Sequence, residues 1–347
     1  FNDAYLGLGL FHYALDFIPG IFKWAVALTG IDPDKEKGFQ YVKRAFRWGR
    51  EDRVESAFHL AKFFTDYTGD YDSAMALLKP IINRFPDNPV FNYQAAVICI
   101  KSGDNFEAEK YLNKVITLGH SSVKQMNALA LFLKGDTYFR RNDYAGAVQF
   151  YSRFLENALD ADYTGIASLR LAVSMQISGK NGDYRGILAS AAGGNSDIFE
   201  DNYAKRVSKK MNGRAFTDEE IMVIKGNNFL ENRQYKNALQ LLANAPLISS
   251  RDLRLNAYLI IAESNINEGK FSEALKFLSL GDEIIPEDNK WLIPKSYYLK
   301  ALIEYKKGNI PLAAEYYRKG ISENDSDFKD QIDTMLNNLK YKIFKNK

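Results

Sequence analysis

Few residues of this 347-residue sequence have the type and spacing that catalysis or metal binding requires. There is one cysteine, Cys99, and a nucleophilic thiol would need a histidine and an orienting acid beside it. Cys99 stands instead at a position of a repeated pattern, described below, that usually holds a buried aromatic side chain. The three histidines, His12, His59 and His120, offer little material for a zinc site and are expected to pack or to cap helices. The sequence therefore predicts no catalytic residue and no metal site.

Glycine patterns that hold nucleotides in other proteins are incomplete in this sequence. Neither the Gly-Lys pair at 179–180 nor the one at 269–270 has a glycine five positions upstream or a Ser or Thr after the lysine. Gly7 and Gly9 lack the third glycine of a dinucleotide fingerprint, so we expect both to permit close helix packing. We predict no bound cofactor and no enzymatic activity.

One basic cluster occurs in the sequence, within residues 205–214. No aromatic side chain lies among these residues to stack on a base, and an acidic run follows at 218–220. Over the whole chain 46 Lys and Arg oppose 43 Asp and Glu, so the net charge of +3 sets no strong field. We therefore predict a solvated face and no nucleic-acid partner. The cluster comprises Lys205, Arg206, Lys209, Lys210 and Arg214.

The sequence predicts that helices hold the cysteine, histidine and basic residues named above. Ala147, Val148, Tyr151 and Leu155 follow the spacing of one helix face, and polar residues fall between them. The segments between such runs are short, polar and mostly contain glycine, as turns do. No run among them alternates with period two, so the sequence predicts an all-α protein.

The helical pattern repeats along the chain. In one copy a small residue, Gly135, is followed by the aromatic Tyr138, the turn residue Asn142 and the alanine Ala147. Equivalent alanines recur at steps of 34 to 39 residues. This pattern resembles the tetratricopeptide repeat, whose unit is a pair of antiparallel helices. The resemblance covers residues 54–322 and implies a right-handed α-solenoid of about seven to eight helix pairs.

Two features interrupt the repeat. The copy that begins at Ala61 has one extra residue before its turn glycine, Gly69. Between Gly186 and Ala238 lie 52 positions, more than in any other step, and we expect an irregular loop and the basic cluster there. The sequence thus predicts a helical block with an apolar insertion at 1–53, repeats at 54–186, an irregular loop and basic segment at 187–217, repeats at 218–322, and a capping helix with a basic tail at 323–347.

An apolar segment, residues 17–31, separates the first two predicted helices, Ala4–Tyr13 and Lys35–Arg47. It contains one charged residue, and Pro19 divides the run into pieces shorter than the about 20 residues that cross a bilayer. We therefore expect no membrane span. Two interpretations stay open: an extra helical hairpin that caps the first pair, or a docking surface for a partner or a bilayer interface. The docking interpretation assigns partner-binding roles to Phe22, Trp24 and Val26.

The amino-terminal block is also similar to the start of a eukaryotic tetratricopeptide family that includes an outer-mitochondrial, inclusion-body-clearing protein. This similarity covers residues 7–38 and their surroundings, and implies no function by itself. The sequence begins with Phe rather than Met, so we expect the natural chain to continue upstream. The sequence predicts neither a compartment nor an oligomeric state.

A non-catalytic scaffold or adaptor is the function that the repeat resemblance implies. In tetratricopeptide proteins the first helices of the pairs line a concave groove that binds a peptide or a protein helix. The competing hypothesis is a structural subunit of a larger assembly, membrane-associated or not, that is held through the amino-terminal apolar block. In both cases the partner is a protein or peptide. The groove positions that match the repeat include Tyr93, Phe132, Asp136, Phe139, Asn227, Glu263, Tyr298 and Tyr305.

Overall fold

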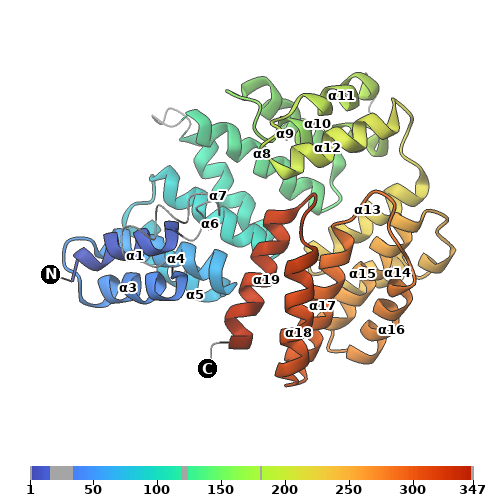
Figure 1. Ribbon diagram of the computed structural model, residues 1–347. Helices are drawn as coiled ribbons and strands as arrows, with labels where there is room; N and C mark the ends of the chain where they lie inside the picture. Colours follow the sequence, from blue (N-terminus) through green and yellow to red (C-terminus); the bar gives the residue numbers. More distant parts are fainter. Residues whose placement is uncertain (1, 16–33, 119–123, 180–181, 345–347) are drawn as a thin grey trace. The chain divides into compact units, whose positions relative to one another are not determined.

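The computed structural model describes residues 2–15, 34–118, 124–179 and 182–344, and its regular elements are helices (Figure 1). There is no β-strand within these ranges, which confirms the predicted all-α fold. The chain divides into two compact units, Phe1–Ile98 and Cys99–Lys347, which we call unit 1 and unit 2. This boundary differs from the predicted one after residue 53, because the amino-terminal helices pack against the first repeat.

The described residues of unit 1 form five α-helices and one π-helix. α1 packs against α3, α3 packs against α4, and α4 packs against α5. The elements are α1 (Ala4–Leu15), α3 (Lys35–Trp48), α4 (Arg53–Phe63), the π-helix η2 (Phe64–Thr68), α5 (Tyr71–Arg84) and the greater part of α6 (Pro89–Lys101).

Two glycines allow α1 and α3 to approach closely. A Cβ atom on Gly38 would lie 2.7 Å from the carbonyl oxygen of Gly9, and one on Gly9 would lie 2.8 Å from the carbonyl oxygen of Gly38. The predicted packing role is therefore confirmed for Gly9. It is wrong for Gly7, because a Cβ there would meet no atom within 4 Å. Asp3 fixes the far end of this helix pair, since its Oδ1 accepts the backbone N–H groups of residues 50–52 at 2.8 to 3.2 Å.

The extra residue of the first repeat is absorbed by a change of helix type. Residues Phe64–Thr68 form the π-helix η2, which continues α4 and ends at Gly69. A π-helix closes its hydrogen bonds over one more residue than an α-helix, so it accommodates an insertion without displacing the turn. The second helix of the pair, α5, therefore begins in register.

Unit 2 contains the remaining helices, which pack largely in pairs along the sequence. The pairs are α8 with α9, α10 with α11, α13 with α14, α15 with α16, and α17 with α18. The elements are α7 (Asn105–Thr117), α8 (Lys124–Arg140), α9 (Tyr144–Asn157), α10 (Thr164–Ser178), α11 (Tyr184–Ser190), the 3₁₀-helix η3 (Ala191–Gly193), α12 (Phe199–Met211), α13 (Asp218–Glu231), α14 (Tyr235–Leu241), the 3₁₀-helix η4 (Ala245–Leu247), α15 (Arg251–Asn267), α16 (Phe271–Asp282), α17 (Leu292–Lys306), α18 (Ile310–Glu323) and α19 (Lys329–Phe344).

Each turn between paired helices contains one residue with left-handed backbone conformation. Their φ angles lie between 56° and 81°, and most are glycine because a side chain is strained there. They include every turn residue that the repeat pattern marks, so the predicted register is confirmed. The residues are Gly69, Gly103, Asn142, Gly179, Arg233, Gly269 and Gly308.

An aspartate follows the left-handed residue in four of these turns and caps the second helix. Its Oδ1 accepts the backbone N–H of the residue three positions later, at 2.9 to 3.0 Å. Such a bond satisfies one of the unpaired donors at a helix start. The capping residues are Asp70, Asp104, Asp143 and Asp183.

We expect Gly269→Ala to lower the free energy of unfolding by about 1 to 2 kcal/mol, because alanine is strained in the left-handed conformation. Gly269 has φ 75°, and a Cβ there would meet no atom within 4 Å, so the change tests the backbone alone. Urea denaturation followed by circular dichroism measures the loss. Gly193→Ala is the matched control, because its Cβ also meets open space and its φ is not positive. A Gly269 variant as stable as the Gly193 variant would contradict the turn assignment.

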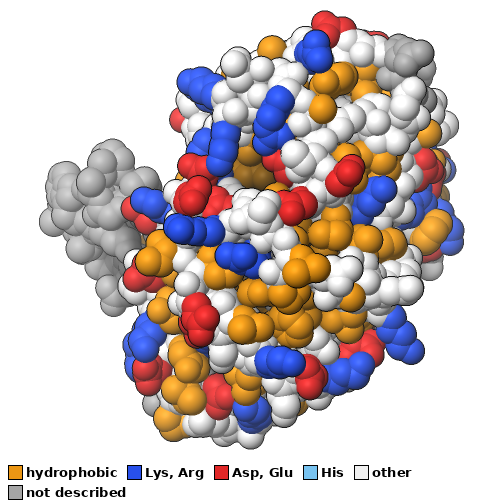
Figure 2. Space-filling view, turned by 90° about the vertical axis from the view of Figure 1, so that its right-hand side faces the viewer, with side chains coloured by type: hydrophobic (Ala, Val, Ile, Leu, Met, Phe, Trp, Pro, Cys, Tyr) orange, Lys and Arg blue, Asp and Glu red, His pale blue; other side chains and the backbone are white. Residues whose placement is uncertain are grey.

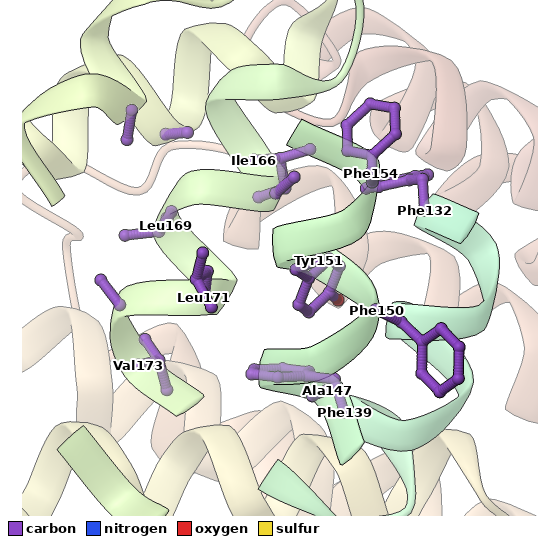
Figure 3. Close-up of a cluster of buried hydrophobic side chains, with 14 of the residues drawn as sticks. Phe132, Phe139, Ala147, Phe150, Tyr151, Phe154, Ile166, Leu169, Leu171 and Val173 are labelled. Atoms are coloured by element: carbon purple, nitrogen blue, oxygen red, sulfur yellow. The ribbon is translucent and has the colours of Figure 1, made fainter. Parts of the chain in front are cut away.

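The largest hydrophobic cluster of unit 2 fills the space between α8, α9 and α10 (Figure 3). Tyr151 and Ala147 of α9 are fully buried in it. The small residue of the repeat faces this ring, since a Cβ on Gly135 would lie 2.7 Å from the Tyr151 side chain. The repeat pattern therefore predicts this close contact of the pair correctly.

Residues 199–211 form the helix α12, whereas the sequence predicts an irregular segment there. Its buried positions include Ala204, Ser208 and Met211, which follow the spacing of one helix face, and Ala204 and Met211 belong to the cluster of α8, α9 and α10. Ser208 Oγ donates to the carbonyl oxygen of Leu188 at 2.6 Å, and Asp201 accepts the backbone N–H of Ile166 at 2.8 Å. Polar bonds to α10 and α11 thus add to the apolar packing that holds this helix.

Candidate functional site

We call the first helix of each pair in unit 2 an A helix; these are α8, α10, α13, α15 and α17. The predicted groove residues of α8, namely Phe132, Asp136 and Phe139, are all buried. The ring of Phe132 lies 5.3 Å from that of Phe154, between centroids, and Phe139 lies 5.6 Å from Tyr144. Their prediction as partner contacts is therefore corrected, because Phe132 and Phe139 join α8 to the core in Figure 3 and Asp136 is 4% accessible.

Asp136 is the centre of a buried charged network. Its carboxylate accepts hydrogen bonds from Arg170 of α10 and from the hydroxyl of Tyr151, the latter at 2.5 Å, and Arg140 lies 3.8 Å away. Burial raises the pKa of Asp136, but the positive charges of Arg170 and Arg140 outweigh burial and lower the pKa below its ordinary value. Burial and the Asp136 carboxylate raise the pKa of Tyr151 well above its ordinary value. The aspartate is therefore ionised and Tyr151 is neutral at pH 7.

The carboxyl-terminal end of α13 attaches to the turn between α8 and α9. The amide nitrogen of Asn228 donates to the carbonyl oxygen of Phe139 at 2.8 Å and to Asn142 Oδ1 at 2.9 Å. Glu231 forms an ion pair of 2.9 Å with Arg140. These contacts join segments more than 80 residues apart in sequence. They extend the Asp136 network from α10 across α8 to α13.

A second surface of A helices, formed by α15 and α17, is less buried. Glu263 and Lys295 form an ion pair across the two helices at 3.2 Å. Tyr298 and Tyr305 are half-buried and pack beside the cluster shared by α17, α18 and α19. The other predicted groove residues, Asn227 in α13 and Tyr93 in α6, are also half-buried.

The basic cluster in α12 is not a freely solvated face. Arg206 donates to Asp327 at 2.5 and 3.0 Å and to Asn289 Oδ1 at 2.9 Å. Lys210 pairs with Asp288. The prediction of a solvated face is therefore wrong for Arg206, which is half-buried, whereas Lys210 is exposed. Their acidic partners are about 80 to 120 residues away in the sequence, so the local pattern contains no sign of them.

The face of unit 2 that Figure 2 shows does not gather one sign of charge. The view in Figure 2, which brings the side where α14 lies to the front, shows Lys and Arg interspersed with Asp and Glu. Hydrophobic side chains are grouped over the middle of the same view. Unit 2 exposes Leu247 and Ile285, which are 80% and 79% accessible.

The residues considered for catalysis occupy ordinary packing positions. Cys99 and His12 are buried, and the ring of His12 lies 5.6 Å from that of Tyr41. Burial lowers the pKa of His59, so its imidazole is neutral at pH 7. In the described part of the chain, no three His, Cys, Asp or Glu side chains are grouped to hold a metal ion. His120 lies outside the described residues.

The partner-binding residues predicted in the amino-terminal block, Phe22, Trp24 and Val26, lie outside the described residues. Among the helices that are described, none is long and apolar enough to cross a bilayer.

Three models of the tetratricopeptide repeat match this chain, at residues 68–130, 102–164 and 294–327. None of them covers the amino-terminal block, so its similarity to a eukaryotic family stays a prediction. No curated protein matches the sequence.

Solved structures of low identity resemble the chain. One is a tetratricopeptide repeat protein from Parabacteroides merdae, with 13% identity and a TM-score of 0.32, over 88% of this chain and 92% of that one. The TPR domain of P58(IPK) has 16% identity and a TM-score of 0.28, over 100% and 99%. The human IFIT1 dimer with PPP-AAAA has 12% identity and a TM-score of 0.33, over 83% and 68%.

The matched models fall on helix pairs whose turns carry the left-handed residues of the predicted register. From Gly103 to Gly308 the same turn conformation recurs in successive pairs. The chain therefore carries tetratricopeptide repeats at residues 68–164 and 294–327.

Proposed function

We propose that this protein is a non-catalytic scaffold that binds a protein or peptide along the A helices of unit 2. Tetratricopeptide arrays are generally protein-interaction scaffolds, and a stacked array presents an extended surface. The observation that supports the proposal best is the ion pair between Glu263 and Lys295, which bridges α15 and α17 beside Tyr298. We call Glu263, Lys295, Tyr298 and Tyr305 the α15–α17 face.

The α15–α17 face combines fixed charges with aromatic surface. Lys295, Tyr298 and Tyr305 are three and seven residues apart on α17, so they lie on one side of that helix. Packing against the cluster below already orders the two tyrosine rings. Binding to ordered rings costs little side-chain entropy, and tyrosine offers both apolar area and a hydroxyl group. The face suits a partner helix or peptide that carries aromatic and charged side chains.

Exchanging the two charges of this ion pair tests the proposal. The double variant Glu263→Lys/Lys295→Glu retains opposite charges across α15 and α17 but reverses the charge that each helix presents. We expect it to weaken binding of a partner captured by pull-down and identified by mass spectrometry by about tenfold or more, as measured by calorimetry.

The control is the same exchange in an exposed pair on another helix, Glu315→Lys/Lys319→Glu in α18, whose charges lie 2.8 Å apart. The Glu315→Lys/Lys319→Glu variant is expected to melt like the parent protein, and the Glu263→Lys/Lys295→Glu variant at a somewhat lower temperature, because its charges are mostly buried. Equal affinity of the two variants for the partner would contradict binding at the α15–α17 face.

A further inference from the structure

One side of α1 in unit 1 is exposed and carries no polar side chain. Leu8 and Phe11 are 45% and 42% accessible, and the small residues at 4, 7 and 14 are also exposed. These positions follow the spacing of one helix face, and α1 contains no Asp, Glu, Lys or Arg. The opposite side of α1, with Leu6 and Gly9, packs against its neighbours. An apolar helix side of this kind indicates an interaction surface.

The helix beside it, α3, presents a basic side. Lys37, Arg44 and Arg47 are exposed and are seven and three residues apart, so they follow one side of the helix. Trp48, at the end of α3, is 67% accessible. An open cleft in unit 1 is lined by Asn2, Gln40, Lys43, Arg44, Arg47 and Trp48.

The apolar and basic sides adjoin each other. The Arg44 guanidinium lies 4.0 Å from the ring centroid of Tyr5, which precedes Leu8 by one helical turn. Arg44 also donates to Asn2 Oδ1 at 3.3 Å. The two helices thus form one surface, with Leu8 and Phe11 on α1 and cations and an indole on α3. We call Leu8, Phe11, Lys37, Arg47 and Trp48 the α1–α3 face.

We propose that the α1–α3 face binds the surface of an anionic lipid bilayer. The phosphates of the headgroup layer would pair with the Lys and Arg side chains, and Leu8 and Phe11 would enter the boundary of the acyl chains. Tryptophan favours the interface between headgroups and acyl chains. A helix side without charges beside a basic side and an exposed tryptophan is the pattern of a segment that lies in an anionic interface. The binding is peripheral, because the 12 residues of α1 are too few to span a membrane. It does not depend on the α15–α17 face.

Co-sedimentation of the full chain with vesicles tests the proposal. We expect binding to vesicles of phosphatidylcholine mixed with phosphatidylserine, little binding to phosphatidylcholine alone, and weakening by salt. Each basic residue near such a surface contributes about fivefold to the partition coefficient, so Lys37→Glu/Arg47→Glu should lower it by about twentyfold or more. The apolar variant Leu8→Glu/Phe11→Glu should lose binding as well. Both variants change exposed side chains and should melt like the parent.

The matched control is Leu247→Glu/Ile285→Glu, which places two acids on exposed aliphatic positions of unit 2 and should leave vesicle binding unchanged. Equal binding to both vesicle types, or no binding to either, would overturn the proposal. A parent dimer in light scattering that Leu8→Glu/Phe11→Glu dissociates, without vesicle binding, would assign the face to a second copy. A lower melting temperature of that variant, again without vesicle binding, would assign it to residues of the same chain.

Discussion

Replacing Ala147 by glutamate is expected to lower the free energy of unfolding by about 4 kcal/mol, because it forces a charge into a site without a polar partner. Ala147 is 0% accessible and belongs to the cluster of α8, α9 and α10. The pair of α8 and α9 contacts α7, α10 and α13, so the damage should extend mainly to these helices. Urea denaturation followed by circular dichroism measures the loss. Ala274→Glu, at the equivalent position of α16, should have a similar effect.

Ala145→Glu is the matched control, because Ala145 is exposed in the first turn of the same helix. A negative charge near a helix start is favourable, so this variant should be as stable as the parent. If Ala147→Glu and Ala145→Glu unfolded at the same urea concentration, the repeat register would be wrong.

Asp136→Asn should lower the free energy of unfolding at pH 7 by about 3 kcal/mol, because it leaves the guanidinium of Arg170 without its buried counter-charge. The same measurement detects the loss. Glu315→Gln removes one partner of an exposed ion pair with Lys319 and should leave the stability unchanged. An Asp136 variant that matched the Glu315 variant would show that the network contributes no stability.

The difference in free energy of unfolding between the parent and the Asp136→Asn variant should depend on pH. The pKa of Asp136 is lowered in the folded state from its ordinary value of 3.8, despite the opposing effect of burial. Its carboxylate therefore contributes fully above pH 3.8, and the contribution is lost as the pH falls from there through the folded-state pKa. Since asparagine does not titrate, the difference in stability between parent and variant should shrink with acidification. A constant difference would contradict the charge-based explanation.

The local features of the fold can be predicted from the sequence because they depend on neighbouring residues. A glycine such as Gly269 marks a left-handed turn, and a small residue such as Gly135 marks a close helix contact, whatever the rest of the chain does. The single extra residue before Gly69 likewise has a local consequence, the π-helix η2. The family's models match residues that carry this pattern.

The contacts that decide which groove positions are accessible could not be predicted in this way. Asn228 reaches the α8–α9 turn across 86 residues, and Arg206 reaches Asp327 across 121. Such bonds depend on how separate helix pairs come together, and single polar residues give no periodic signal. The transferred groove positions assume an open array, whereas Phe132 and Asp136 are covered within unit 2.

Site-specific photo-crosslinking tests the central claim, that a protein partner lies on the α15–α17 face, most directly. A photoreactive phenylalanine analogue at position 298 should yield an adduct with the captured partner. The same analogue at position 247, which is 80% accessible, should yield none. Adducts from position 247 and none from position 298 would place the partner elsewhere and contradict the proposed scaffold surface.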